Sequence, residues 1–286
     1  MYLLTKYEQF KKEYSKLKNN FGKVYCNCLF PSKIISEIIS ENNCFLTESN
    51  NGFLILTSKD SPKGFLKVYY FLGDCNSFPV LPANCPLIVE EIDICGKKSN
   101  YLEKIIAILA EAGFHETAKN VYVEISLKES SLYSLIQASL EQLANNCYYI
   151  DADPDEKYIK EGFKLWERYL KPTDIPEEHY QTSLTKKNHI LTVLDKNQKV
   201  CGVNWWAFHN NICEIRHTVT HPNYYRQNIG TSMILYALNE GIINGCHSAY
   251  TFIDSNNTIS IKMYEKIGFR LTEKISRQFI FSEKKQ

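Results

Sequence analysis

The sequence lacks an excess of charge of either sign. Its 286 residues hold 33 Lys and Arg against 32 Asp and Glu, which gives a formal net charge of +1. A chain this close to neutrality has no overall field that would draw it to nucleic acid or to an anionic membrane. We therefore expect no nucleic-acid partner, and we expect recognition to depend on local sites.

Long apolar segments are also missing. No run approaches the ~20 apolar residues that a membrane-spanning helix needs, so we expect no membrane association. The chain starts with MYLLTKYEQFKK, which has no apolar core of the kind that a signal peptide carries. These two absences favour a cytoplasmic protein with reduced thiols.

A second close pair of cysteines is absent as well. The chain has ten cysteines, but only Cys26 and Cys28 lie close together in the sequence. A zinc finger or zinc ribbon requires two such pairs. We therefore predict no metal site, because free cysteines commonly pack as small hydrophobic side chains.

What the sequence does contain is enough apolar residues for two cores. Hydrophobic residues make up 44% of the chain and aromatic residues 13%, against 23% charged residues. A length of 286 residues suits two domains, because domain lengths cluster near ~100 to 150 residues. We predict an N-terminal domain over residues 1–145 and a C-terminal domain over residues 146–286.

Apolar periodicity and turn residues predict an α/β (α+β) chain. In the first half we expect helices over residues 1–20 and from Pro31, and strands over residues 52–57, 65–72 and 87–94. In the second half we expect a helix capped by Asp153, with Pro154 in its first turn, that ends before Pro172. Strands should follow over residues 190–194, 199–208 and 213–220.

A faint repeat links the two halves. Gly113-Phe-His-Glu-Thr-Ala-Lys119 matches Gly268-Phe-Arg-Leu-Thr-Glu-Lys274 at four of seven positions. Each copy follows a predicted helix, where a glycine suits the left-handed residue that ends a helix and the phenylalanine returns to the core. This pattern predicts an internal duplication, with a twisted mixed sheet flanked by helices in each half.

The segment from Thr218 to Leu238 combines an apolar strand, a polar loop and an amphipathic helix. Asn228 and Gly230 in the loop tolerate left-handed backbone angles, so successive amide hydrogens can converge at the positive end of the helix. This arrangement is typical of an anion site that holds a pyrophosphate. An ordinary tight turn from strand to helix is the alternative interpretation.

The loop resembles the pyrophosphate loop of the GCN5-related N-acetyltransferase (GNAT) superfamily, whose pattern is Gln/Arg-x-x-Gly-x-Gly/Ala. Tyr225 stands where the family has Gln or Arg, Asn228 replaces the first glycine, and Gly230 holds the second. Arg226 or Gln227 could supply the polar side chain that Tyr225 lacks.

A second segment, Asn257-Thr-Ile-Ser-Ile-Lys-Met-Tyr-Glu-Lys-Ile-Gly-Phe269, is similar to the family's Asn-x-x-Ala/Ser-x-x-x-Tyr-Glu-Lys-x-Gly-Phe motif. On a helix, Asn257, Ser260 and Tyr264 fall at steps of three and four, so they would present an amide, a hydroxyl and a phenol to one ligand. Ile259, Met263 and Ile267 should form an adjoining apolar stripe that faces the core.

The resemblance covers residues 149–282 and implies a twisted mixed sheet with helices on both sides. The first half looks like a degenerate copy of the same fold. It has the closing Gly113-Phe114 pair, but after Ile94 only Cys95-Gly-Lys-Lys-Ser-Asn100 stands where a phosphate loop would be expected. Such a copy would shape the acceptor cleft or stabilise the second half.

The resemblance also implies the chemistry, in which an amine attacks the thioester of acetyl-CoA directly, without a metal. A backbone amide near Val219 would meet the oxyanion, and the Tyr264 phenol would donate to the leaving sulfur. The residues implied to bind the cosubstrate are Thr218, Val219, Thr220, Tyr225, Arg226, Gln227, Asn228, Ile229, Gly230, Thr231, Asn257, Ser260 and Tyr264.

Glu214 is the candidate general base, since it lies on the strand that leads into the loop, where a branch of the superfamily has a glutamate base. An exposed or Arg-paired carboxylate is the alternative, and a water chain could replace it. In a regular strand Glu214, Arg216 and Thr218 would share one face, and His217 would compete only if the other face opened to the cleft. Trp205 and Trp206 should point to opposite faces and pack in the core, and His209 and His221 should lie in loops.

The sequence therefore predicts an acetyl-CoA-dependent N-acetyltransferase that acts on a primary amine of a small molecule, peptide or protein, as a monomer or homodimer. A non-catalytic acyl-CoA-binding or sensory module is one alternative. An aminoacyl transferase of the tandem-fold kind, using charged tRNA, is another. The neutral charge and the intact second motif argue against the tRNA-dependent reading.

Overall fold

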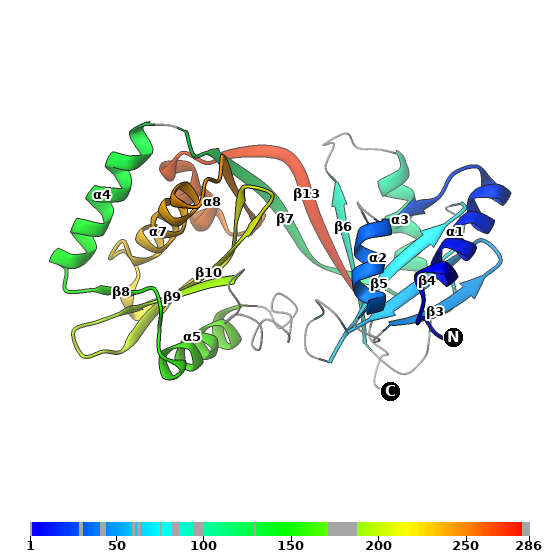
Figure 1. Cartoon of the computed structure of the whole chain (residues 1–286), viewed down its shortest axis with the longest axis horizontal. Coiled ribbons are helices and arrows are strands. Elements are labelled where there is room, and N and C mark those ends of the chain that lie inside the picture. Colours follow the sequence, from blue (N-terminus) through cyan, green and yellow to red (C-terminus); the bar gives the residue numbers. More distant parts are fainter. Residues whose placement is uncertain are drawn as a thin grey trace. The chain divides into compact units, whose positions relative to one another are not determined.

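The computed structural model describes residues 2–28, 31–40, 44–58, 61, 64–74, 76–81, 86–93, 100–128, 130–170 and 188–281. These residues pack into two compact units, each with a sheet flanked by helices (Figure 1). The first unit holds the described residues up to Lys119 and from Lys274 onward. The second holds the described residues from Asn120 to Glu273. The predicted α/β class is confirmed.

The second unit is built on a mixed sheet. Its strands lie in the order β7, β12, β11, β10, β9 and β8. β11 and β12 are parallel, and the other neighbouring pairs are antiparallel. The bounds are β7 (His115–Ser126), β8 (Tyr149–Asp151), β9 (Asn188–Leu194), β10 (Val200–His209), β11 (Ile212–Thr220) and β12 (Ser248–Asp254).

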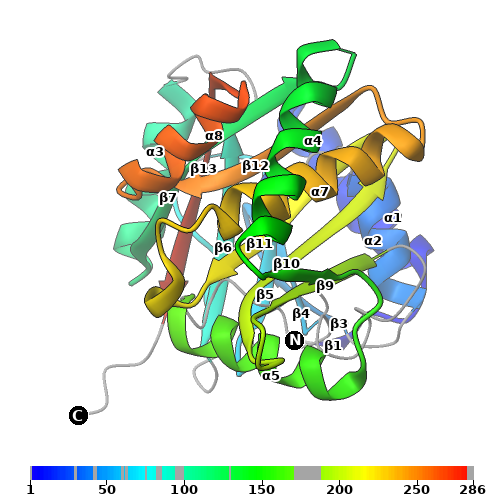
Figure 2. The same ribbon diagram turned by 90° about the vertical axis from the view of Figure 1, so that its left-hand side faces the viewer.

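Helices cover both faces of this sheet. On one face, α5 (Glu156–Tyr169) buries Phe163 and Trp166 against Val203 and Trp205 of β10. On the other face lie α7 (Ile229–Ile243) and α8 (Thr258–Ile267). The helix α4 (Ser130–Asn145) packs on the outer side of α7 (Figure 2). Because α7 lies between the sheet and α4, its side chains are apolar nearly all the way round.

The first unit has a sheet in the order β1, β3, β4, β5, β6 and β13. Helices α1 and α2 cover one face and α3 covers the other. The bounds are β1 (Tyr2–Leu3), α1 (Tyr7–Phe21), β2 (Tyr25–Cys26), α2 (Pro31–Ser40), β3 (Cys44–Ser49), β4 (Gly52–Thr57), β5 (Leu66–Leu72), β6 (Leu87–Asp93), α3 (Asn100–Glu111) and β13 (Arg270–Phe281).

The two units repeat one order of elements and exchange their last strands. β7 follows α3 in the sequence but pairs with β12, and β13 follows α8 but pairs with β6. In both copies the helix ends at a left-handed glycine, Gly113 with φ 90° and Gly268 with φ 111°. The phenylalanine after each glycine is buried, at 4% exposure for Phe114 and 3% for Phe269. The tandem architecture predicted from the short repeat is therefore present.

The units divide at other residues than the predicted boundary between 145 and 146. Residues 120–145 pack with the second unit, because β7 completes its sheet and α4 covers α7. The residues from Lys274 onward pack with the first unit, because that part of β13 pairs with β6. Exchange of the final strands is a long-range pairing, which local sequence patterns do not report.

Most predicted elements are present, with shifted ends. The helix predicted to start at Asp153 begins at Glu156, with Asp155 in the capping position. Pro172, where that helix was predicted to stop, lies outside the described residues, as do Cys95 to Ser99. No pattern in the sequence predicted α4.

Candidate functional site

The parallel strands β11 and β12 part from one another in the middle of the second sheet. Their pairing runs through Ile212 with Ser248 and Cys213 with Ala249, and it ends at Glu214 with Tyr250. Residues 215–220 of β11 stay paired only with β10 on their other side. The sheet therefore contains a gap bordered by the second half of β11.

A β-bulge at Arg216 turns the side chains of β11 just where the gap begins. Trp205 pairs with His217 and Trp206 with Ile215, so Arg216 is the extra residue. Ile215 belongs to the core on the α7 side, whereas Val219 packs on the α5 side. The regular strand assumed from the sequence is thus wrong, because a bulge shifts the alternation by one residue. Glu214 and Thr218 consequently point to opposite faces.

Backbone geometry decides which amide hydrogens point into the gap. The His221 amide donates to Cys201 O at 2.8 Å, and hydrogen-bonded pairs recur every second residue in an antiparallel ladder. The Val219 amide therefore points toward β10, and the amides of Thr218 and Thr220 point toward β12. The register favours Thr218 or Thr220, and not Val219, as the donor to an oxyanion.

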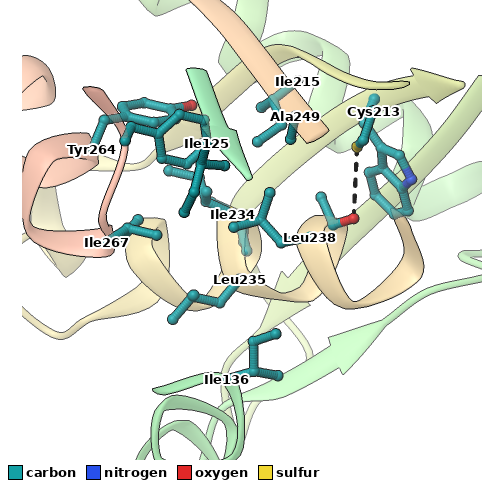
Figure 3. Packing of buried hydrophobic residues seen from close by; sticks show 14 of the residues in the cluster. Ile125, Ile136, Cys213, Ile215, Ile234, Leu235, Leu238, Ala249, Tyr264 and Ile267 are labelled. Atoms are coloured by element: carbon teal, nitrogen blue, oxygen red, sulfur yellow. Dashed lines mark hydrogen bonds between the residues drawn. The ribbon is translucent and has the colours of Figure 1, made fainter. Parts of the chain in front are cut away.

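Tyr264 of α8 reaches the same gap from the α7 side. It is 5% exposed, and its hydroxyl faces the side chains of Thr218 on β11 and Thr251 on β12. Its ring packs edge-on against Phe269, and Figure 3 shows Tyr264 among other buried residues of the same core. Burial raises the pKa of Tyr264 to about 12 and outweighs the effect of the Thr218 and Thr251 side chains, which lower it. The phenol is therefore protonated at neutral pH.

Asn204, which the sequence did not single out, holds Thr218 in place. Thr218 Oγ1 donates to Asn204 Oδ1 at 2.9 Å, and Asn204 Nδ2 donates to Met233 O of α7 at 3.0 Å. Asn204 is fully buried. A buried polar side chain with both of its ends satisfied fixes its neighbours in one arrangement.

The loop from His221 to Asn228 joins β11 to α7. A short 3-10 turn, η1 (Pro222–Tyr224), is followed by Arg226 with φ 62° and Asn228 with φ 66°. Two left-handed residues separated by one other residue turn neighbouring amide hydrogens toward the same side, which makes a concave anion-binding surface. The left-handed conformation expected of Asn228 is present, and Asn228 is the N-cap of α7.

A run of backbone amides in this loop is available to a ligand. No described residue accepts a hydrogen bond from the amide hydrogens of Arg226, Gln227, Asn228, Ile229, Gly230 or Thr231. The first intrahelical bond of α7 comes from Ser232, which donates to Asn228 O at 2.9 Å. Free amides at the positive end of a helix attract an anion such as a pyrophosphate.

Small residues keep the start of α7 close to the sheet. A Cβ on Gly202 of β10 would lie 2.9 Å from Ile229 Cγ2, and a Cβ on Gly230 would lie 3.3 Å from Thr220 Oγ1. The side chain of Ile229 is buried, so only its amide can serve the loop. Tyr225 is exposed, and the Tyr148 hydroxyl donates to Gln227 Oε1.

The start of α8 matches the predicted motif only in part. Asn257 is the N-cap, and its Oδ1 accepts from the Ser260 amide at 3.1 Å, so Asn257 lies just outside the helix. Ser260 is half-buried and Tyr264 is buried. Ile267 is also buried, but Ile259 is 82% exposed, so the predicted apolar stripe is wrong at its first position, in the first turn of α8.

Glu214 lies on the opposite face of the sheet in a cluster of polar groups. Its Oε2 accepts from Arg216 Nε at 2.9 Å and lies 3.1 Å from His209 Nε2. Burial raises the pKa of Glu214, but the hydrogen bonds and charges of His209 and Arg216 outweigh it and hold the pKa at about 2. Glu214 therefore has the Arg-paired environment that was the alternative to a base. His209, predicted as a loop residue, is the last residue of β10.

The bulge at Arg216 places His217 on the same face of the sheet as Glu214. His217 packs on the α5 side between Trp166 and Trp205, with ring centroids 5.7 Å and 5.4 Å away. Trp205 and Trp206 are both buried, the first on the α5 side and the second on the α7 side. The predicted opposite orientation of the two tryptophans is confirmed.

Aromatic side chains border Glu214 on its side of the sheet. Tyr250 of β12 stacks on Tyr122 of β7 with centroids 5.0 Å apart, and Phe252 meets Tyr122 edge-on at 5.1 Å. All three rings are half-buried. Burial, followed by the negative charge of Glu214, raises the pKa of Tyr250. A ligand that approaches the gap from this face would meet aromatic rings and a carboxylate.

The first unit has a corresponding pair of parallel strands, but its own chain fills the gap. β5 and β6 pair at Leu66 with Leu87 and at Lys67 with Ile88. Beyond that point Asn27 bridges the strands, donating to Val68 O at 2.9 Å and to Glu90 O at 3.3 Å and accepting from the Tyr70 amide at 3.0 Å. The described residues between β5 and β6 form no helix. Within the part of the chain that the structure describes, a gap and a helix start occur together only in the second unit.

The described residues also bear on metal, disulfide and membrane sites. Within the described ranges, no cluster of three or more His, Cys, Asp or Glu side chains could hold a metal ion. The cysteines in these ranges are free thiols, and the Cys26 thiol donates to Cys28 O at 3.3 Å. None of the helices in the described ranges is long and apolar enough to cross a membrane.

Comparison with known proteins agrees with this geometry. Residues 138–269 match the family model described as "Acetyltransferase (GNAT) family". They form a GNAT domain. The matched segment contains the gap, the loop, α7 and Tyr264, so the resemblance seen in the two motifs extends over the GNAT domain. A search of the curated proteins with this sequence found no match.

Solved structures resemble the chain over both units. A GCN5-related N-acetyltransferase-like protein from Streptococcus suis 89/1591 is 14% identical, with 94% of this chain and 98% of that chain covered and a TM-score of 0.53. A tandem GNAT protein from the clavulanic acid biosynthesis pathway is 12% identical, with 82% of this chain and 80% of that chain covered and a TM-score of 0.53. A GCN5-related N-acetyltransferase from Kribbella flavida is 10% identical, with 88% of this chain and 95% of that chain covered and a TM-score of 0.52. At these identities the likeness shows a shared fold that includes the GNAT domain.

Proposed function

We propose that the second unit is an acyl-CoA-dependent N-acyltransferase that transfers an acetyl group from acetyl-CoA to a primary amine. The observation that carries this proposal is the run of free amides from Arg226 to Thr231, in the loop and helix start that follow β11, the strand that borders the gap. A pyrophosphate at the loop would direct the rest of the cosubstrate along β11. The thioester would then lie beside Thr218, Thr220 and Tyr264.

In this proposal the amine nitrogen attacks the thioester carbonyl. The new carbon–nitrogen bond forms, the carbon–sulfur bond breaks, and coenzyme A leaves as a thiolate. The amide of Thr218 or Thr220 stabilises the oxyanion, since preorganised donors in a water-poor site stabilise developing charge. The protonated Tyr264 hydroxyl donates to the thiolate.

The acceptor would approach from the face that carries Glu214, Tyr122 and Tyr250. A primary amine with a pKa near ~10 is mostly protonated at neutral pH and must lose a proton before it attacks. A base works best when its pKa lies near the working pH, and the pKa of Glu214 lies at about 2. We therefore propose that Glu214 attracts the cationic acceptor and that water carries the proton away.

The test is thiol release from acetyl-CoA in the presence of pooled amines, preceded by thermal-shift screening of acyl-CoA compounds. We expect acetyl-CoA to raise the melting temperature and at least one amine pool to release free thiol. Binding of acetyl-CoA without turnover across a broad amine panel would instead favour a coenzyme-binding or sensory module. Failure to bind any acyl-CoA would contradict the proposal and favour the tRNA-dependent transferase.

A further inference from the structure

We propose that Ser139 and Gln142 of α4 are positioning residues that hold Asn228, and with it the anion-binding loop, in the conformation the cosubstrate needs. The inference rests on the proposed function, because it concerns the loop that would bind the pyrophosphate of coenzyme A. It explains why asparagine stands where the related loop pattern has glycine.

Asn228 has a backbone conformation that a side chain normally disfavours. Its φ of 66° and ψ of 4° lie in the left-handed region, which glycine adopts freely and other residues adopt at a steric cost. Asn228 makes no side-chain cap to its own helix. Its side chain must therefore be held by something else if the loop is to keep one conformation.

The amide group of Asn228 is held by α4. Its Nδ2 donates to Ser139 Oγ at 3.0 Å and to Gln142 Oε1 at 3.0 Å. These acceptors come from one helix, at positions three residues apart, so they lie on the same face of α4. Both hydrogens of the side-chain amide are used.

Two serines close this contact into a ring of hydrogen bonds. Ser139 Oγ lies 2.8 Å from Ser232 Oγ, and Ser232 Oγ donates to Asn228 O at 3.0 Å. With one proton on each hydroxyl, the ring runs from the Asn228 side chain to Ser139, then to Ser232 and back to the Asn228 carbonyl. Ser139 is 5% exposed and Ser232 is fully buried, so water does not compete for these bonds.

The support behind the ring is buried apolar packing between α4 and α7. Ile136 and Leu143 of α4 are buried in the same apolar cluster as Leu235 of α7, and Figure 3 shows Ile136 beside Leu235. Just after α4, the Tyr148 hydroxyl donates to Gln227 Oε1 and so ties the neighbouring loop residue. The loop is therefore fixed to a helix that lies outside both of the motifs in the sequence.

The discriminating experiment replaces Asn228 by the glycine of the related pattern. Asn228→Gly relieves the backbone cost but removes both hydrogen bonds to α4. We expect it to weaken coenzyme A binding by about tenfold, the size expected for two hydrogen bonds, with kcat unchanged within about twofold. Ser139→Ala and Gln142→Ala should act in the same direction, and the matched controls Ser134→Ala and Gln137→Ala on exposed positions of α4 should change nothing.

Two readouts separate this inference from the proposed function. Isothermal titration with coenzyme A and the split between KM and kcat report on the loop as a binding surface. Amide hydrogen exchange at Ser232, measured without any ligand, reports on the ring itself, because that amide donates to Asn228 O. Faster exchange in Asn228→Gly supports the ring even for a protein that binds no coenzyme. Unchanged exchange, or an Asn228→Gly variant that binds coenzyme A as tightly as the parent, overturns the inference.

Discussion

The hydroxyl of Tyr264 faces the side chain of Thr218, so the middle of α8 meets the strand that borders the gap in the second sheet. Thr218 faces α8 only because the bulge at Arg216 shifts the alternation of β11. The same bulge leaves Glu214 on the opposite face. Because of this one bulge, Thr218 lies on the face of the sheet where the leaving sulfur would be stabilised, and Glu214 lies on the face that would receive the amine.

Replacing Tyr264 by phenylalanine should slow turnover and leave binding nearly intact. Loss of the donor to the thiolate is expected to lower kcat by about 10- to 100-fold. This factor is at the low end of the rate enhancement that proton transfer by a positioned side chain supplies. KM for acetyl-CoA should stay within about twofold. Steady-state thiol release measures both constants. Tyr236→Phe, which changes a half-buried tyrosine of α7, is the matched control. Normal turnover in Tyr264→Phe would remove the role assigned to Tyr264.

Glu214→Gln should lower kcat/KM by less than the loss of a general base would. Because Arg216 and His209 hold the pKa of Glu214 at about 2, we expect kcat/KM to fall by about tenfold or less through weaker attraction of the cationic amine. The rate should rise with pH in both proteins, since the amine itself must lose its proton. A pH profile of kcat/KM from pH 6 to 10 tests this. A loss of a hundredfold or more, with a changed profile, would establish Glu214 as the base predicted from the sequence.

The chain should bind one molecule of coenzyme A, in the second unit. Asn27 fills the gap between β5 and β6 in the first unit, and the described residues between these two strands offer no helix start for a pyrophosphate. Titration calorimetry should give a stoichiometry of one. Gly230→Glu, which puts a carboxylate into the anion-binding loop, should abolish binding altogether. Two sites, or binding that survives this substitution, would show that the first unit also holds coenzyme.

Glu91 in the first unit should make stability depend on pH. It is 5% exposed, and its Oε1 has no hydrogen-bond partner among the described residues. Burial raises its pKa from 4.5 to about 8, against a hydrogen bond with Tyr70 that lowers it. A carboxyl group whose pKa is higher in the folded chain favours folding below the unfolded pKa, and this contribution is lost as the pH rises toward 8.

Replacing Glu91 by glutamine, its neutral isostere, should remove the loss of stability that comes from ionising a buried carboxyl group. Glu91→Gln is expected to stabilise the protein by about 3 kcal/mol at pH 7 to 8, with no gain near pH 4. Urea unfolding at several pH values measures it. Glu90→Gln, at the neighbouring and more exposed position, is the control and should change stability by less than about 1 kcal/mol at every pH. A Glu91→Gln variant with no gain at pH 8 would show that Glu91 is ionised without cost in the folded protein.

The sequence alone determined the local features of this protein. Apolar spacing predicted most helices and strands, the Gly-Phe pairs predicted the duplication, and the residue types at Asn228 and Gly230 predicted a loop with left-handed backbone. These features depend on a few neighbouring residues, so a linear pattern reports them. Asn257 to Phe269 likewise predicted a helix that presents Tyr264.

Only the tertiary structure decided how distant segments meet. The exchange of β7 and β13, the bulge at Arg216, the ion pair that lowers the pKa of Glu214, and the ring that joins Ser139 to Asn228 all depend on residues brought together by packing. Such contacts are set by the shape of the core and leave no periodic trace in the sequence. For the same reason the gap in the first unit, closed by Asn27, became visible only in the fold.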